Sequence, residues 1–271
     1  MIYRVLTIAG SDSGGGAGIQ ADLKTFSALG VYGCSVITAV TAQNTQSVTD
    51  IHLIPNTTIQ AQIEAVLDDI LIDAIKIGML GSSSIVKTVA KTLQGYSGPI
   101  VLDPVIVAKS GATLLDDHAI DALRDNLLPR ADLLTPNIPE ANTLLGHANG
   151  NMFDRATGLM ALGPKAILMK GGHGKEAICS DFLVDTKTRL KLETPRINTC
   201  NTHGTGCSYS SAIAAGLAKG WTLTQAVETS HHWLHQAIRQ SDKLSVGKGF
   251  GPIHHFHNIW TERWDDSHVT F

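Results

Sequence analysis

The stretch Asn201–Gly216 (N-T-H-G-T-G-C-S-Y-S-S-A-I-A-A-G) places two glycines and a thiol directly before a run of small, helix-compatible residues. It predicts a helix that begins near Cys207. Helix N-termini have unpaired N–H groups and partial positive charge, and Gly204 and Gly206 would let backbone N–H groups point at a ligand. This pattern suits the charge that develops on a phosphoryl group during transfer. A structural loop with a buried cysteine would explain it as well.

At a helix N-terminus, Cys207 is expected to have a thiol pKa below the usual value of about 8.5. The other cysteines are Cys34, Cys179 and Cys200, and no two of the four form a C-x-x-C pair. We therefore expect thiols rather than disulfides.

A second glycine loop, G-S-D-S-G-G-G-A-G, covers residues 10–18 between an expected strand and an expected helix. The chain has no GxxxxGK[ST] phosphate loop. Gly16, Gly18 and Ala21 fit the looser GxGxxA form of a dinucleotide fingerprint, but the second strand ends at residues 41–44 without the acidic residue that would hold a ribose. The loop is then a tight turn, or a turn that lets substrate approach the main chain.

Helical and extended patterns alternate along the chain. The expected strands are Tyr3–Ala9, Cys34–Val40, Ala74–Ile77, Ile100–Leu102, Leu133–Thr135, Ala166–Met169 and a hairpin of Ala177–Val184 with Arg189–Glu193. The expected helices are Ala17–Leu29, Ile59–Leu71, Ser84–Leu93, Asp117–Leu128, Met152–Leu162, Gly206–Ala218 and Leu223–Gln240. This alternation predicts one α/β domain over residues 1–271, with a mainly parallel sheet covered on both faces and a ligand beyond the carboxyl ends of its strands.

The chain of 271 residues is 43% hydrophobic and 17% charged, with a net charge of −3. Without a basic patch, this composition argues against nucleic acid and anionic membranes as partners. The N-terminal residues lack the apolar core of a signal peptide, and no apolar run is long enough for a transmembrane helix. We expect a cytoplasmic protein that binds small molecules.

Residues 201–215 resemble the signature of the hydroxymethylpyrimidine and phosphomethylpyrimidine kinases of thiamine synthesis, which belong to the ribokinase-like superfamily. Further similar segments follow in the expected order at 9–30, 36–45, 76–80, 101–111, 127–141, 168–173 and 247–257. The chain departs from the family at Asp12-Ser13-Gly14, where members usually have Asp-Pro-Ser, and in a short segment between Leu145 and Leu162.

The resemblance implies a three-layer αβα sandwich with a small hairpin or flap, a homodimer, and ATP with Mg²⁺. It implies transfer of the γ-phosphoryl group of ATP to 4-amino-5-hydroxymethyl-2-methylpyrimidine, and a second transfer to the monophosphate. Gln43 would pair with the pyrimidine, because its amide supplies a donor and an acceptor. The other implied substrate contacts are Ala17, Asp22, Met79 and Val105.

The resemblance also assigns the phosphate chemistry. Gly204, Thr205, Gly206 and Cys207 would form the anion hole, with the thiol standing where much of the superfamily has an aspartate as general base. Asn137 and Glu140 resemble the N-x-x-E motif that manages Mg²⁺ and phosphates, often through water, although Asn137 would also suit a helix cap. The remaining implied residues are Asp103 at the metal, Lys170 at the phosphates and Thr202 at the nucleotide.

Other functions stay open at this point. A pyridoxal-type kinase shares the fold and sometimes the Gly-Thr-Gly-Cys loop, although Gln43 and residues 9–30 favour the pyrimidine. The presence of Asn137, Glu140 and residues 204–207 argues against a pyrimidine-binding regulator without catalysis. The missing ribose acid disfavours a nicotinamide oxidoreductase. Two groups of histidines, His231 with His235 and His254–His257, match no zinc pattern.

Overall fold

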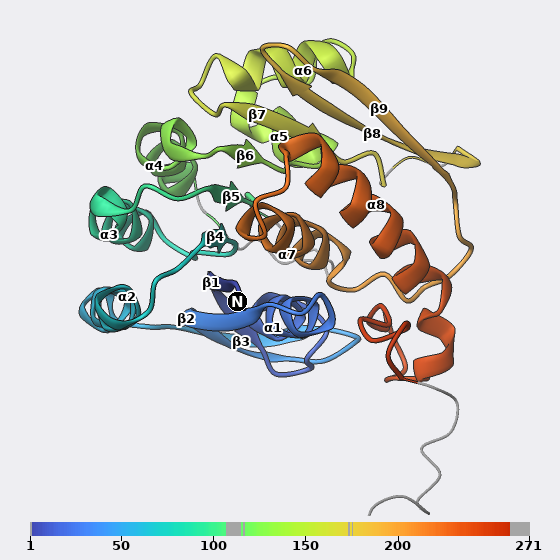
Figure 1. Cartoon of the computed structure of the whole chain (residues 1–271), viewed down its shortest axis with the longest axis horizontal. Coiled ribbons are helices and arrows are strands. Elements are labelled where there is room, and N and C mark those ends of the chain that lie inside the picture. Colours follow the sequence, from blue (N-terminus) through green and yellow to red (C-terminus); the bar gives the residue numbers. More distant parts are fainter. Residues whose placement is uncertain (1, 107–114, 116, 173, 175, 261–271) are drawn as a thin grey trace, which may run out of the picture.

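The computed structural model of the chain describes residues 2–106, 115, 117–172, 174 and 176–260. Across these residues the strands form one nine-stranded sheet in the order β3-β2-β1-β4-β5-β6-β7-β8-β9 (Figure 1). The strands are β1 (Arg4–Asp12), β2 (Tyr32–Gln43), β3 (Val48–Leu53), β4 (Ala74–Ile77), β5 (Ile100–Leu102), β6 (Leu133–Leu134), β7 (Ala166–Met169), β8 (Ile178–Asp185) and β9 (Arg189–Pro195).

The six central strands, β2, β1, β4, β5, β6 and β7, run parallel to one another. At the edges, β3 is antiparallel to β2, β8 to β7 and β9 to β8. β1 pairs with β2 on one side and with β4 on the other, so the chain winds in opposite directions from β1. Ligands of open α/β sheets bind at such a switch point, beyond the carboxyl ends of the strands. The topology therefore places a candidate site at the ends of β1, β2 and β4.

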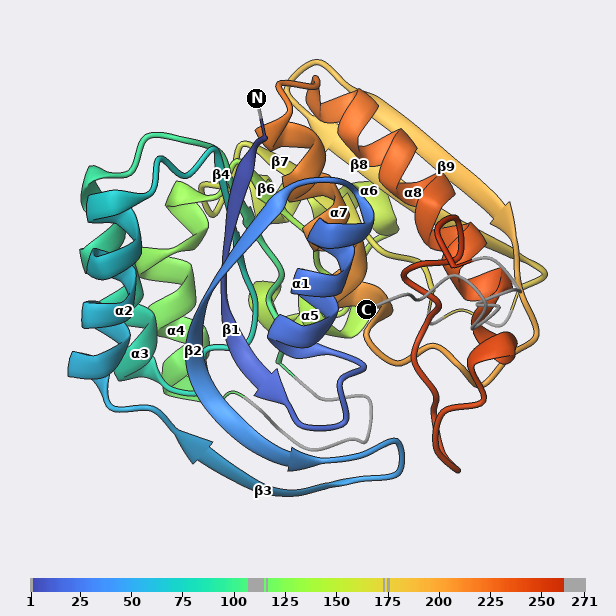
Figure 2. The same cartoon turned by 60° about the horizontal axis from the view of Figure 1, so that its bottom comes forward.

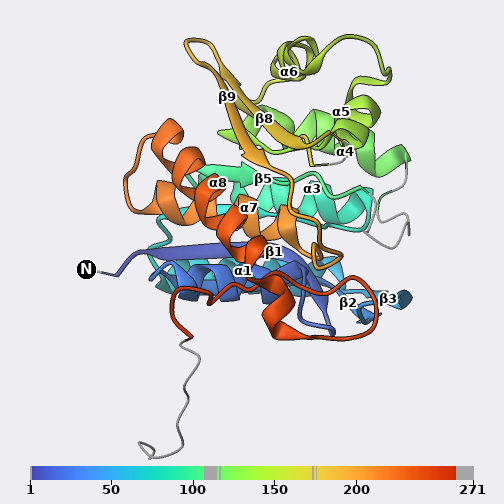
Figure 3. The same cartoon turned by 90° about the vertical axis from the view of Figure 1, so that its right-hand side faces the viewer.

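Helices cover both faces of the sheet, which makes three layers (Figures 1 and 3). One face carries α1 (Gly18–Ala28), α7 (Thr205–Ala218) and α8 (Leu223–Arg239). The other carries α2 (Asn56–Asp69), α3 (Ser83–Thr92), α4 (Asp117–Asn126), α5 (Ile138–Leu145) and α6 (Met152–Met160). Short 3-10 helices cover Leu93–Gly95, Leu128–Arg130 and Ser241–Leu244. No helix in the described ranges is both long and apolar enough to cross a membrane.

The expected fold class, a ribokinase-like three-layer sandwich, is confirmed. The ranges expected for β4, β5 and β7 coincide with the observed strands. β1 and β2 run further than expected, to Asp12 and Gln43, and β3 (Val48–Leu53) was not expected at all. None of the residues of β3 is buried, so the strand shows no apolar alternation that a sequence pattern could reveal. Figure 2 shows the long β2–β3 hairpin curving past the end of β1.

Candidate active site

Two glycine loops meet at the carboxyl end of β1. Residues 10–18 lead from β1 into α1, and residues 201–204 lead into α7. Gly204 has a φ of 76° and packs against the carbonyl oxygen of Gly16, so that a Cβ atom would clash there. Gly18 has a φ of 55° and faces the carbonyl oxygen of Gly10 in the same way. Glycine is required at both positions because two stretches of backbone lie in contact and φ is positive.

The N-terminus of α7 faces the ion pair of Lys170 with Asp103. α7 begins at Thr205, with Gly204 as N-cap, and no side chain caps its first N–H groups. A Cβ atom on Gly206 would lie 3.2 Å from Nζ of Lys170 and 3.6 Å from Oδ2 of Asp103. Backbone donors, the positive end of a helix and a lysine ammonium group thus converge on one place. This combination is able to bind a phosphoryl group.

A cavity of about 80 Å³ opens at the switch point of the sheet. Four of the expected substrate contacts lie in its wall, namely Ala17, Gln43, Met79 and Val105. The wall is mainly apolar with a few polar groups, which is the usual composition of a small-molecule site. The cavity therefore collects residues from four separate segments of the chain around the side chain of Gln43.

Cys207 lies in the first turn of α7, at the wall of this cavity. Burial raises the pKa of its thiol to about 11, although Lys76 and the backbone N–H of Gly18 act in the opposite direction. Asp22 and Asp103 raise this pKa further. The expectation of a lowered thiol pKa is therefore wrong, because the loss of hydration outweighs the effect of the helix N-terminus.

Asp22 does not border the cavity, although a substrate contact was expected there. Its side chain is fully buried, and Nζ of Lys76 lies 2.9 Å from both of its carboxylate oxygens. The hydroxyl groups of Thr7 and Ser211 donate to the same carboxylate at 2.6 and 2.7 Å. The structure thus places Asp22 behind Lys76, and Lys76 is the residue that borders the cavity.

Asp103 and Lys170 follow the ends of β5 and β7 and form an ion pair, with 2.7 Å between Oδ1 and Nζ, in which Asp103 is buried and Lys170 is partly buried. The hydroxyl of Thr135 donates to the same Oδ1 atom at 3.0 Å. Although burial lowers the pKa of Lys170, the nearby Asp103 and Glu140 carboxyls raise it above its usual value. Lys170 therefore carries a positive charge close to the start of α7.

Asn137 and Glu140 form a capping box at the start of α5. Oδ1 of Asn137 accepts the backbone N–H of Glu140 at 2.9 Å, and Oε2 of Glu140 accepts the backbone N–H of Asn137 at 2.8 Å. The expected helix cap is therefore present. Burial raises the pKa of Glu140 to about 7, although Lys170 lowers it in part. A cation near Glu140 would favour its charged form.

Among the residues of the cavity wall that sequence reasoning missed, three have ionisable side chains: Asp12, Lys76 and His203. Asp12 and His203 lie within the two glycine loops that drew attention for other reasons. Lys76 carried a signal of its own, since it is the polar residue in an apolar strand (A-I-K-I) and a lysine is almost never buried without a partner.

Thr202 lies in the loop before α7, where its carbonyl oxygen accepts the N–H of Thr205 at 3.4 Å. Its expected contact with a nucleotide remains a prediction. Within the described ranges, no group of three or more histidine, cysteine, aspartate or glutamate side chains is arranged to hold a metal ion. The four cysteines are free. Residues 107–111 and 173 of the family-like segments lie outside the described residues.

Comparison with known proteins supplies the family. The model of the phosphomethylpyrimidine kinase family matches residues 12–254 of the chain. The chain belongs to this family. A hydroxymethylpyrimidine/phosphomethylpyrimidine kinase of Rhizobium meliloti is 49% identical over 261 residues, which are 95% of this chain and 98% of that protein. A thiamine biosynthesis bifunctional protein of Geobacter sulfurreducens is 47% identical over 256 residues, 93% of this chain and 52% of that protein.

Solved structures of two kinds of kinase resemble the chain. A phosphomethylpyrimidine kinase from Clostridium difficile is 44% identical, with a TM-score of 0.77, over 87% of this chain and 99% of that chain. A Bacillus subtilis pyridoxal kinase in complex with ADP is 37% identical, with a TM-score of 0.86, over 94% of this chain and 98% of that chain. Fold similarity alone therefore does not distinguish a pyrimidine kinase from a pyridoxal kinase. The side chains that line the cavity must determine which substrate binds.

Proposed function

We propose that this chain phosphorylates 4-amino-5-hydroxymethyl-2-methylpyrimidine with ATP and then phosphorylates the monophosphate to the diphosphate, in thiamine diphosphate biosynthesis. The chain is a kinase, and its family and close relatives support both steps. The observation that carries the proposal is that one cavity has both Gln43 and Cys207, from the first turn of α7, in its wall. Gln43 would bind the aminopyrimidine there while the helix terminus faces the phosphoryl group.

The anion hole is proposed to consist of Gly204, Thr205, Gly206 and Cys207, whose backbone donors would bind the transferred phosphoryl group. Lys170 would offset phosphate charge from the other side, since its Nζ atom lies close to Gly206. Ala17, Met79 and Val105 would enclose the pyrimidine ring. Thr202 is proposed to contact the nucleotide.

Mg²⁺ is proposed to accompany ATP, with Glu140 and Asp103 on the protein side. The residues fit this ion, because Mg²⁺ prefers oxygen ligands and keeps several of its waters. Burial raises the pKa of Glu140 to about 7, although Lys170 and the backbone N–H of Asn137 compensate part of its charge, so the charged carboxylate would gain from a further nearby cation. Asn137 would hold Glu140 in place through the capping box. The metal would neutralise phosphate charge as the phosphoryl group is transferred.

We also propose that residues 1–271 form a single kinase domain that acts as a cytoplasmic homodimer. The continuous sheet supports the single domain, and the dimer and the compartment follow from the family resemblance. Sedimentation equilibrium at several protein concentrations would measure the subunit number. A monomer throughout this range would contradict the dimer without affecting the kinase assignment.

The function is tested by incubating the purified protein with Mg·ATP and hydroxymethylpyrimidine. The products are identified by mass spectrometry after short and long times. A monophosphate followed by a diphosphate is the expected result. Phosphorylation of pyridoxal without phosphorylation of the pyrimidine would assign the chain to the sister activity, which its structural similarity to pyridoxal kinases makes the natural second candidate. Pyrimidine binding without turnover would indicate a regulator.

A further inference from the structure

His203 stands between Asp12 and Gln43 at the wall of the cavity. Its Nε2 atom lies 2.8 Å from Oδ2 of Asp12 and 3.3 Å from the side-chain nitrogen, Nε2, of Gln43. The imidazole packs against Gly16, and its backbone N–H donates to the carbonyl oxygen of Gly251 at 3.0 Å. The side chain is about 10% exposed, and that of Asp12 about 3%. His203 is therefore held in one position, with a single ring nitrogen facing both neighbours.

Asp12 decides which atom carries the proton. Its carboxylate already accepts backbone N–H groups from Gly14 at 2.8 Å, Gly16 at 3.0 Å and Ala17 at 2.8 Å. Although burial alone would raise the pKa of Asp12, the hydrogen bonds from His203 and Ala17 bring it below its usual value. An ionised carboxylate only accepts hydrogen bonds. Nε2 of His203 must therefore be protonated and must donate.

The amide of Gln43 has to match this donor. The nitrogen and oxygen of an amide have nearly the same shape, and their positions are decided by their hydrogen-bond partners. A nitrogen atom of Gln43 facing Nε2–H of His203 would set one donor against another. The two amide positions of Gln43 therefore have to be exchanged, so that the oxygen lies on the His203 side, accepts a second branch of the Nε2–H bond and removes the repulsion.

The opposite end of the amide leads to the same assignment. The hydroxyl oxygen of Thr41 lies 3.1 Å from the amide position of Gln43 that the structure assigns to Oε1, and 2.9 Å from the carbonyl oxygen of Ser11. A carbonyl oxygen only accepts, so the one proton of Thr41 is used there. Thr41 is then left to accept a hydrogen bond, and the amide group that faces it must be the nitrogen. Both ends of Gln43 therefore give one orientation.

We propose that His203 is a positioning residue that fixes the orientation of the Gln43 amide and thereby makes the site specific for a 4-aminopyrimidine. The proposal rests on the proposed function, in which Gln43 pairs with the pyrimidine. The fixed amide presents its oxygen to the 4-amino group and its N–H to the adjacent ring nitrogen. A 4-oxo pyrimidine presents the reverse order, a carbonyl acceptor beside a ring N–H donor, and is rejected because the amide is held against turning.

The test compares the first phosphorylation of the 4-amino substrate with that of its 4-oxo analogue, which keeps the methyl and hydroxymethyl groups. The measured quantity is the ratio of the two kcat/KM values in each variant. In His203→Leu the amide is free to turn, and we expect the ratio to fall at least about 10-fold, mostly through a gain on the 4-oxo analogue. His203→Gln should keep most of the ratio, since one amide nitrogen has protons for both Asp12 and Gln43.

Ser208→Ala is the matched control. Ser208 lies near the start of α7, and its hydroxyl is 2.9 Å from Nε2 of the buried His255 rather than paired with Gln43. We expect this control to leave the ratio unchanged even if both rates fall. Thr41→Val removes the second support of the amide and should also lower the ratio, which keeps the test decisive if His203→Leu does not fold.

An unchanged ratio in both His203→Leu and Thr41→Val would overturn the proposal and leave His203 a purely structural role. The proposed function fails in a different way. In that case the unmodified chain phosphorylates neither pyrimidine, and the inference falls with it. A wild-type chain that uses both pyrimidines equally well would overturn the inference while leaving the kinase activity intact.

Discussion

Nζ of Lys76 lies 2.9 Å from both carboxylate oxygens of Asp22, and neither side chain is exposed to solvent. The lysine borders the substrate cavity and acts on the thiol of Cys207, whose pKa it lowers. A charged lysine in the middle of the sheet is tolerable only because Asp22 compensates it, and Asp22 in turn keeps two hydroxyl donors from Thr7 and Ser211. The pair links the stability of the fold to the electrostatics of the site.

Lys76→Met should therefore destabilise the chain by about 3–5 kcal/mol, because it leaves an uncompensated buried carboxylate. The double variant Lys76→Met with Asp22→Asn removes both charges and should regain a large part of this loss. Urea unfolding of the two single variants and the double variant gives the coupling free energy. If the double variant loses the sum of the two single losses, the pair is not coupled as the geometry indicates.

Cys207→Ala should affect the two phosphorylations unequally. The first acceptor is a hydroxyl group that must lose a proton, and a general base contributes roughly 10²–10⁴-fold to such a step. The second acceptor is a phosphate that needs little help from a base. Initial rates with the alcohol and with the monophosphate, each in the presence of saturating ATP, measure the two effects. An equal loss in both steps would rule out the thiol as the base.

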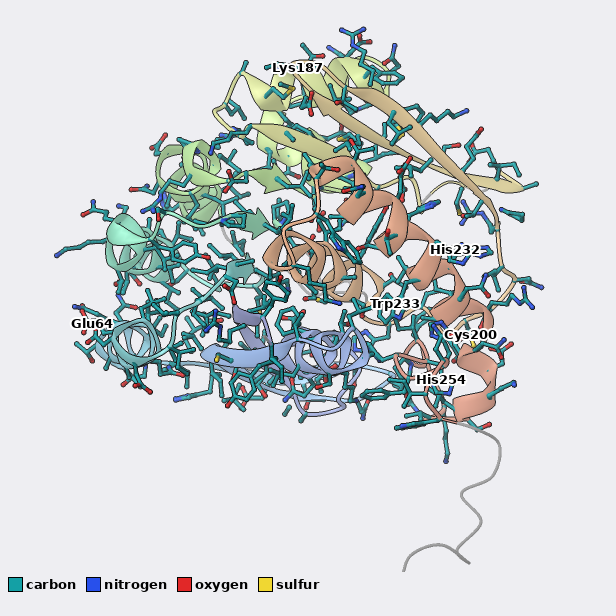
Figure 4. All side chains as sticks on the ribbon, viewed as in Figure 1. Glu64, Lys187, Cys200, His232, Trp233 and His254 are labelled. Carbon is teal, nitrogen blue, oxygen red and sulfur yellow. The ribbon has the colours of Figure 1, made fainter. Side chains whose placement is uncertain are left out.

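Alkylation should rank the cysteines by exposure and thiolate character. Cys200 is exposed and lies at the periphery beside the end of α8 (Figure 4), whereas Cys207 lies in the site with its pKa raised to about 11. Near pH 8 only about a thousandth of the Cys207 thiol is ionised, and this fraction grows about tenfold per pH unit until the pKa is reached. We expect iodoacetamide to modify Cys200 first, with Cys207 becoming reactive only at high pH. Peptide mass mapping over time at pH 7, 8 and 9 would detect this order, and early modification of Cys207 at pH 7 would contradict the raised pKa.

Asn137→Ala should weaken both the helix cap and the handling of ATP. Loss of an N-cap side chain costs about 1 kcal/mol. The chain offers a matched control, because Asn151 forms a second, exposed capping box with Asp154 at the start of α6. Both alanine variants should lose similar stability in thermal unfolding, while only Asn137→Ala should also raise the KM for Mg·ATP. Equal KM values in the two variants would reduce Asn137 to a helix cap.

The sequence by itself determined the fold class and the strands that are buried on both faces. β4, β5 and β7 are short apolar runs whose burial leaves a direct mark on composition, so their expected bounds coincide with the observed ones. β3 is paired through its backbone while its side chains remain accessible, and such pairing leaves no apolar pattern to recognise. The residue types in the loop 201–207 were likewise enough to indicate a helix N-terminus that suits an anion.

Only the tertiary structure decided how the charged and polar groups pair. Asp12 and His203 are 191 positions apart, and no local pattern connects them. The family resemblance placed Asp22 among the substrate contacts, but it could not show that Lys76 lies between Asp22 and the cavity. The pKa of Cys207 also depends on how completely the neighbouring segments exclude water, which raises it against the expected effect of the helix terminus. Patterns along a chain record which residues are buried, whereas desolvation and hydrogen-bond partners arise only when distant segments pack together.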